Sequence, residues 1–192
     1  IGPEPALIMD IGGGSIEFII GTNSEILWKE SFEIGGQRML EQFQKNDPIL
    51  SSEIVALREY LELHLEKLVK ACQQHEPRTL IGSSGTFDTL SDIYQLANDL
   101  TKQDMDTEYP LTLHSFEDTL QQVVRKNRAQ RLAIPGMIPL RVDMIVVACV
   151  LVDYVIKKLD LKKVRVSAYA LKEGVLLSTI HSLQVLNKST ES

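Results

Sequence analysis

The sequence has few of the features that mark secreted, disulfide-stapled or membrane-spanning proteins. Only two of its 192 residues are cysteines, and both Cys72 and Cys149 fall within apolar helical patterns, which predicts buried free thiols. Aromatic residues make up 6% of the chain, so aliphatic side chains must form most of the core. The longest nearly uncharged apolar run, 144–152, is shorter than the roughly 20 residues that cross a bilayer, and no signal peptide is visible. We therefore expect a cytoplasmic protein with no membrane contact.

Positive charge is also scarce, since the net charge is −6. An acidic chain is a poor candidate for non-specific binding to nucleic acid, which requires a basic surface. A basic run at Arg125, Lys126, Arg128 and Arg131 leaves two interpretations open. The pattern favours a solvated helix face, and the alternative is the wall of a groove for a polyanion. The four histidines lack the spacing of metal ligands.

The hydrophobic residues, 44% of the chain, are arranged as alternating strands and helices. Short apolar or alternating runs predict strands over 6–9, 16–20, 26–34, 79–81 and 163–168. Helical spacing predicts helices over 37–44, 52–74, 87–100, 116–128, 141–159 and 171–186, with a loop over 101–110. Early strands joined by a hairpin, followed by strands reached through helices, predict one α/β domain over 1–192. Its sheet is expected to be mixed and five-stranded and to be flanked by helices.

A glycine-rich turn follows the first predicted strand, directly after Asp10. Its members are Gly12, Gly13 and Gly14. Glycines at a strand end allow backbone N–H groups to approach a phosphate without obstruction by a Cβ atom. The Asp10 carboxylate at the mouth of the turn can hold Mg²⁺, usually through waters. A glycine-rich hairpin without a ligand is the alternative, although a bare hairpin needs fewer glycines.

Two polar residues after this turn extend the candidate site. Ser15 offers a hydroxyl, and Glu17 shares a strand face with Ser15, opposite the apolar Ile16 and Phe18. Glu17 therefore points away from the core and toward a metal or a water. Two other glycine motifs are excluded here, because a Walker loop requires a lysine and the dinucleotide fingerprint requires a third glycine where Glu17 stands.

A second polar turn lies between the predicted strand 79–81 and the helix 87–100. It consists of Gly82, Ser83, Ser84, Gly85 and Thr86. Free N–H groups at a helix N-terminus bind anions, and an ordinary strand–helix turn with a hydroxyl cap is an equally good interpretation. The turn is not a nucleophile elbow, because that motif would require glycine at position 86.

Several charged or polar residues complete the candidates. Arg141 and Asp143 begin an apolar helix, where charges lie at a cleft or form a structural ion pair. Ser167 lies next to the end of the last predicted strand, and Glu173 favours the positive end of the final predicted helix.

Taken together, these pieces resemble the exopolyphosphatase and guanosine pentaphosphate phosphohydrolase (Ppx/GppA) family. The similarity runs from Leu7 to about Leu177 and includes Arg38. Its segments are Asp-Ile-Gly-Gly-Gly-Ser-x-Glu at 10–17, Gly-Gly-Gln-Arg-Met-Leu-Glu-Gln-Phe at 35–43, Gly-Ser-Ser-Gly-Thr at 82–86, Arg-Val-Asp at 141–143 and Arg-Val-Ser-Ala-Tyr-Ala-Leu-Lys-Glu-Gly-Val-Leu at 165–176. Each piece is weak alone, and five in the same order are a strong signal.

The resemblance implies a ribonuclease-H-like lobe of the actin, hexokinase and heat-shock ATPase superfamily. It implies that Asp10 and Glu17 serve Mg²⁺ and water, and that the backbone at 12–15 and 82–86 holds phosphates. The implied reaction removes terminal phosphate from polyphosphate or from guanosine pentaphosphate by attack of water.

One departure from the family pattern is large. The family carries a first lobe with a general-base glutamate before the Asp-Ile-Gly-Gly-Gly motif, and here only nine residues precede Asp10. Glu4 is the only carboxylate among them, and it does not lie in the base-bearing segment. We therefore expect this chain to be the second lobe, inactive alone, with an N-terminal lobe of the same protein and a homodimer as candidate partners. A non-catalytic nucleotide-binding, polyphosphate-binding or dimerisation module, and a lobe of a small-molecule kinase, remain alternatives.

Overall fold

The computed structural model describes residues 1–101 and 106–169, which form a mixed sheet with helices packed against it. Its strands are β1 (Ala6–Ile11), β2 (Ile16–Gly21), β3 (Ile26–Phe32), β4 (Thr79–Ser83), β5 (Glu108–Tyr109) and β6 (Lys163–Ser167). They lie in the order β3-β2-β1-β4-β6-β5. The first three strands are antiparallel neighbours, β1, β4 and β6 are parallel, and β5 is antiparallel to β6. The expected α/β class with a mixed sheet is confirmed.

The sheet has six strands rather than the five that the sequence predicts. The additional strand, β5, lies within the predicted loop 101–110 and pairs Tyr109 with Val166. With only two residues it is too short to show the alternation that identifies a strand in a sequence. Its pairing depends on the position of β6, which only the folded chain supplies.

The helices follow the predicted segments with shifts of a few residues at their ends, so that Arg141 and Asp143 precede α7 instead of beginning it, and with two larger differences. They are α1 (Gly36–Phe43), α2 (Ser51–His64), α3 (Glu66–His75), α4 (Ser84–Ala97), α5 (Leu113–Arg125), α6 (Arg128–Leu132) and α7 (Met144–Lys158). The predicted helix 52–74 is divided into α2 and α3 at Leu65, although backbone hydrogen bonds of 3.0 Å from Leu65 to Leu61 and from Val69 to Leu65 continue across the junction. The short helix α6 was not predicted, and the predicted helix 171–186 lies outside the described residues.

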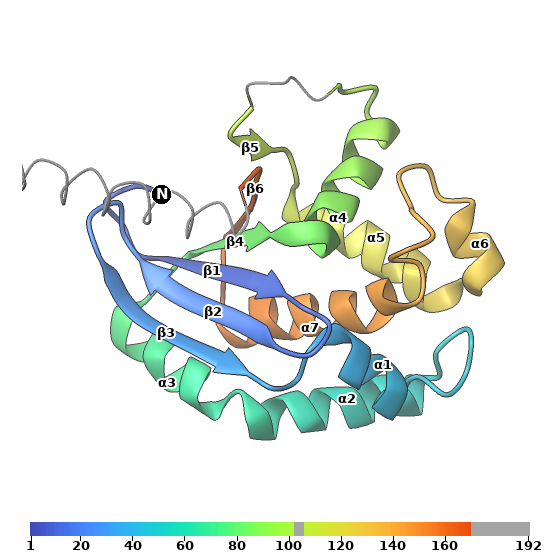
Figure 1. Cartoon of the computed structure of the whole chain (residues 1–192), viewed down its shortest axis with the longest axis horizontal. Coiled ribbons are helices and arrows are strands. Elements are labelled where there is room, and N and C mark those ends of the chain that lie inside the picture. The colour runs from blue at the N-terminus through green and yellow to red at the C-terminus, as the bar shows by residue number, and fades with distance from the viewer. Residues whose placement is uncertain (102–105, 170–192) are drawn as a thin grey trace, which may run out of the picture.

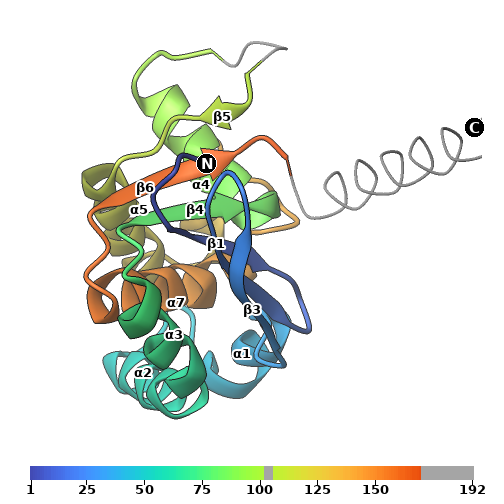
Figure 2. The same ribbon diagram turned by 90° about the vertical axis from the view of Figure 1, so that its left-hand side faces the viewer.

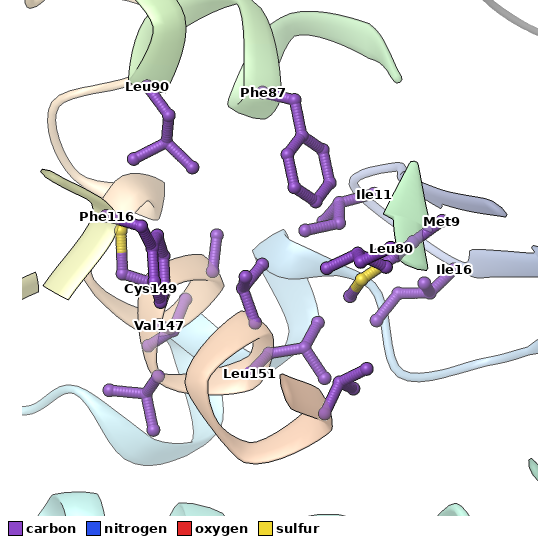
Figure 3. Close-up of a cluster of buried hydrophobic side chains, with 14 of the residues drawn as sticks. Met9, Ile11, Ile16, Leu80, Phe87, Leu90, Phe116, Val147, Cys149 and Leu151 are labelled. Atoms are coloured by element: carbon purple, nitrogen blue, oxygen red, sulfur yellow. The ribbon is translucent and has the colours of Figure 1, made fainter. Parts of the chain in front are cut away.

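The core lies between the sheet and α7. Side chains from β1, β2, β4, α4 and α5 converge on α7, whose Val147 and Leu151 are fully buried (Figure 3). Helices α1, α2, α3 and α7 lie along one face of β1, β2 and β3 (Figure 1). The predicted buried free thiols are confirmed for both cysteines, and burial raises the pKa of the Cys72 thiol to about 12. These cysteines are therefore packing residues, since a thiol with so high a pKa carries almost no thiolate at neutral pH.

The parallel strands bring three predicted site residues to one edge of the sheet. Because β1, β4 and β6 run side by side in the same direction, their carboxyl ends meet at that edge (Figure 2). Asp10, Ser83 and Ser167 lie at or next to those ends. In open α/β sheets ligands bind at the carboxyl edge. None of the helices in 1–101 and 106–169 has the length and apolar character needed to cross a membrane.

Candidate functional site

Asp10 occupies the centre of the candidate site because of the strand register. It lies directly opposite Glu17 on β2 and directly opposite Ser83 on β4. Residues directly opposite one another in neighbouring strands point to the same face of the sheet, with Cβ atoms about 4.5–5.5 Å apart. The register therefore places two carboxylates and a hydroxyl side by side, with the Asp10 side chain largely buried.

Two serine hydroxyls fix the Glu17 carboxylate. Ser15 Oγ donates to Glu17 Oε1 over 2.5 Å, and Ser31 Oγ donates to the same oxygen over 2.9 Å. Both bonds use Oε1, so Oε2 is the oxygen that these serines leave for other ligands. Ser31 was not among the predicted site residues. Its register opposite Glu17 on β3 is the signal that could have found it, and that register is a property of the sheet.

The first glycine turn is held from behind by the start of α1. The carbonyls of all three glycines accept backbone hydrogen bonds, which are Gly35 N–H to Gly14 O (3.1 Å), Gly36 N–H to Gly12 O (2.8 Å) and Gln37 N–H to Gly13 O (2.9 Å). Within the described part of the chain, the amides of Gly13 and Gly14 donate no hydrogen bond to another backbone carbonyl. The turn therefore directs its carbonyls toward α1 and leaves N–H groups as the polar groups suited to an anion.

Gly35 must be glycine for this arrangement. A Cβ atom at that position would overlap the backbone of Gly13 and Gly14, which can move only if the turn itself moves. Arg38 reinforces the same contact, because its Nε donates to Gly14 O over 2.8 Å and its Nη2 pairs with Glu33 over 2.8 Å. In this structure Arg38 therefore supports the turn from behind.

The second glycine turn joins β4 directly to α4. Ser83 precedes the helix in an extended conformation, its side chain makes no capping hydrogen bond, and the first turn of α4 contains no acidic residue. The first N–H groups of α4 are thus suited to bind an anion. Ser84 has a φ of 70°, a left-handed value that costs a non-glycine residue on the order of 1–3 kcal/mol. Strain of this kind is common at ligand-binding turns.

Arg141 lies against this second turn from a distant part of the chain. A Cβ atom at Gly85 would overlap the Arg141 guanidinium, so the glycine is needed for the close approach. Arg141 Nε and Thr86 Oγ1 are both buried and have no hydrogen-bond partner among the described residues. A buried polar atom without a partner is unusual in a folded protein, and both groups can donate a hydrogen bond to an anion. The structure thus brings a cation, a hydroxyl and a helix N-terminus together.

The remaining predicted residues are less central. Asp143 pairs with Arg128 over 3.1 Å and lies 3.9 Å from Arg131, so it forms the structural ion pair that was one of its two interpretations. Ser167 Oγ accepts a hydrogen bond of 3.1 Å from Tyr169 N–H, and Ser167 is separated from β1 by β4. Glu173 lies outside the described residues.

The basic run does not form a uniform solvated face. Arg131 is only 1% exposed and is held by Asp47 over 2.6 Å, whereas the side chain of Arg128 is 51% exposed. The interpretation of Arg131 as a solvated residue was therefore wrong, because its acidic partner lies 84 positions away in sequence.

The donor set at Asp10 and Glu17 fits Mg²⁺. Among the described residues no group of three or more His, Cys, Asp or Glu side chains is arranged to hold a metal ion, which argues against an all-protein cage. Mg²⁺ is usually bound by one or two carboxylates together with waters and substrate phosphates. Two carboxylates beside a phosphate-suited turn match that pattern.

Known proteins resemble this chain in sequence and in fold. The family model of the Ppx/GppA phosphatase family matches residues 3–183. Exopolyphosphatase 2 of Mycobacterium tuberculosis is 27% identical over 180 residues, which cover 91% of this chain and 55% of the relative. The crystal structure of an exopolyphosphatase from Cytophaga hutchinsonii superposes with a TM-score of 0.87 at 44% identity, covering 94% of this chain and 58% of that one.

A more distant structure supports the fold alone. The Ppx/GppA enzyme of Aquifex aeolicus has a TM-score of 0.78 at 24% identity and is covered over 57% of its length. The chain therefore spans a little more than half the length of the relatives that it matches.

Proposed function

Because the chain belongs to the Ppx/GppA phosphatase family, we propose that it supplies the phosphate-binding lobe of a phosphoanhydride hydrolase. The substrate is inorganic polyphosphate, guanosine pentaphosphate or both, and the reaction is removal of the terminal phosphate. The observation that carries the proposal is a carboxylate pair beside two glycine turns at one sheet edge: the first turn joins the two strands that carry the pair, and the second follows the neighbouring strand β4.

The two turns would bind the phosphates of the substrate. The N–H groups at 13–15 and those at the start of α4 are preorganised donors, and the Arg141 guanidinium adds a positive charge beside Gly85. Preorganised donors stabilise the charge that develops on a phosphoryl group in transfer, and they need no reorganisation during the reaction.

Asp10 and Glu17 would hold Mg²⁺ and orient the attacking water. Bound Mg²⁺ would neutralise charge on the phosphate oxygens. The hydroxyls of Ser15 and Ser31 hold one oxygen of Glu17, which directs the other toward the water or the metal. Water attacks the terminal phosphorus in line with the leaving phosphate, which departs with the electrons of the broken P–O bond.

The chain alone is expected to be inactive or nearly so. It spans 55% of the mycobacterial relative, and among the described residues no third acidic side chain joins Asp10 and Glu17 in a metal-holding group. We propose that the general base and the rest of the substrate cleft come from an N-terminal lobe of the same protein. Efficient phosphate release from Mg²⁺-polyphosphate by the 192-residue chain would contradict this part of the proposal.

The experiment measures phosphate release by the protein produced from its full reading frame, with Mg²⁺ and with polyphosphate and guanosine pentaphosphate tested in parallel. Glu17→Gln is expected to lower the rate about 100-fold or more, the range typical of a lost catalytic group. Glu25→Gln, an exposed carboxylate beyond the far end of β2, is the matched control and should leave the rate unchanged. Absence of release from both substrates would favour the binding-module or kinase alternative.

A further inference from the structure

Arg131 is the largest fully buried side chain among the described residues, and its guanidinium makes three hydrogen bonds. Its Nη1 donates to Asp47 Oδ1 and to Lys126 O, both over 2.6 Å, and its Nε donates to Val142 O over 2.9 Å. Replacing a buried ion pair by apolar residues is often neutral or stabilising, so such a pair is weak evidence for stability alone. The position of the groups that it joins indicates a different role.

The guanidinium is hydrogen-bonded to three separate segments of the chain, at Asp47, Lys126 and Val142. Asp47 belongs to the loop between α1 and α2, Lys126 precedes α6, and Val142 precedes α7. Asp47 also accepts a hydrogen bond of 2.6 Å from the Arg128 backbone N–H. Arg131 therefore fixes the approach to α7 against two other parts of the fold.

Val142 directly follows Arg141, so a hydrogen bond to the Val142 carbonyl restrains the backbone on the C-terminal side of Arg141. The Arg141 backbone N–H donates to Ile138 O over 3.0 Å, and the Arg141 carbonyl accepts from Ile145 N–H over 2.8 Å. The Nε of Arg131 donates to the carbonyl of the following residue, Val142. With its backbone held on both sides, Arg141 can place its guanidinium against Gly85.

We propose that Arg131 is a positioning residue, which holds Arg141 over the second glycine turn and so sets the affinity of that turn for phosphate. The proposal rests on the proposed function, because it assumes that the turn binds phosphate. Arg131 itself is buried and does not contact the ligand. Its planar fork is what joins Asp47 to Val142, and a lysine cannot reproduce both contacts.

The test measures binding of inorganic tripolyphosphate by calorimetry, using the protein from its full reading frame. Arg131→Lys and Arg141→Ala are each expected to weaken binding about tenfold, the loss for one displaced charge-assisted hydrogen bond. Adding Arg131→Lys to Arg141→Ala should cause no further loss, because the two residues act through one contact. A purely structural role would give losses that add. Arg78→Gln removes an exposed arginine that precedes β4, at the opposite end of that strand from the second turn, and is the control that should bind like the parent.

A second variant separates positioning from stability. Asp47→Leu combined with Arg131→Met replaces the ion pair by apolar side chains, which restores packing without the guanidinium. The proposal predicts that this folded variant still binds tripolyphosphate about tenfold more weakly than the parent. Normal affinity in it, or additive losses in the double variant above, would overturn the role of Arg131 and leave the proposed function standing. Failure of the parent protein to bind tripolyphosphate would instead refute the proposed function.

Discussion

The two glycine turns are both rich in small residues but are held in place differently. The first is fixed by backbone hydrogen bonds to the start of α1, within about 25 residues of its own sequence, and Gly35 lies against its backbone. The second contains a strained Ser84 and depends on Arg141, which lies more than 50 positions later in the chain. The first turn is therefore a locally determined element, whereas the second is completed by tertiary structure.

This difference predicts that equivalent changes will have different consequences. A change that disturbs the first turn must move backbone and should reduce stability. A change that disturbs the second turn can be accommodated by movement of the Arg141 side chain. Such a change should reduce phosphate binding and not stability.

Gly35→Ala is expected to have the larger effect on stability. The added Cβ atom would overlap the backbone of the first turn, and overpacking of this kind typically costs about 1–3 kcal/mol. Chemical denaturation of the purified protein measures the loss. Gly2→Ala, where no atom lies within 4 Å of the added Cβ, is the matched control and should be within about 0.5 kcal/mol of the parent. An equal loss in both variants would contradict the close-packed contact.

Gly85→Ala is expected to reduce binding more than stability. The three atoms nearest to the added Cβ atom all belong to the guanidinium end of Arg141, a flexible side chain that can move aside. Tripolyphosphate affinity should fall about tenfold, the value of one charge-assisted hydrogen bond, while the denaturation midpoint changes little. Unchanged affinity would show that Arg141 does not serve the second turn.

Ser31→Ala tests whether the hydroxyl of Ser31 holds the Glu17 carboxylate beside the first turn. The side chain is exposed, so folding should be unaffected, and the loss of one hydrogen bond to the carboxylate should cost roughly 1 kcal/mol of transition-state stabilisation. Phosphate release should fall several-fold and Mn²⁺ affinity, measured by electron paramagnetic resonance, should fall with it. Ser31→Thr retains the hydroxyl and should restore both quantities. No change in either would mean that Ser15 alone fixes Glu17.

Glu53→Gln is the mildest of these changes and affects the loop that carries Asp47. Burial raises the pKa of Glu53, but hydrogen bonds from Leu50, Asn46 and Lys45 outweigh it and hold the pKa below its ordinary value of 4.5. A carboxylate with a lowered pKa stabilises the folded state at neutral pH and loses that effect as pH falls through the folded pKa.

The variant should therefore be about 0.5 kcal/mol less stable than the parent at pH 7, because glutamine keeps an acceptor oxygen but loses the negative charge in the first turn of α2. The difference should shrink as the pH falls below 4.5 and through the lower pKa of the folded carboxyl, because the parent then loses its negative charge. Denaturation midpoints at pH 7 and at pH 3 measure both limits. A difference that persists at the lower pH would mean that Glu53 acts through packing instead of charge.

Much of the fold follows from patterns within single segments. The alternation of Ile16, Phe18 and Ile20 identifies β2, and the uniformly apolar α7 is recognised by its length. The two-residue β5 was not predicted, because it is too short to show a periodic pattern. The break at Leu65 was not predicted, because it does not interrupt the helical pattern. The predictions on Glu173 and on Mg²⁺ remain predictions.

The sequence by itself determined the residues of the two turns, the carboxylate pair and the family, because each is a short motif whose chemistry depends on neighbouring residues. The tertiary structure alone decided that Ser31 supports Glu17, that Arg131 is buried and that Arg141 lies against Gly85. Each of these contacts joins segments that are distant in the chain. Their partners are chosen by strand register and helix packing, and no local pattern in the sequence records that choice.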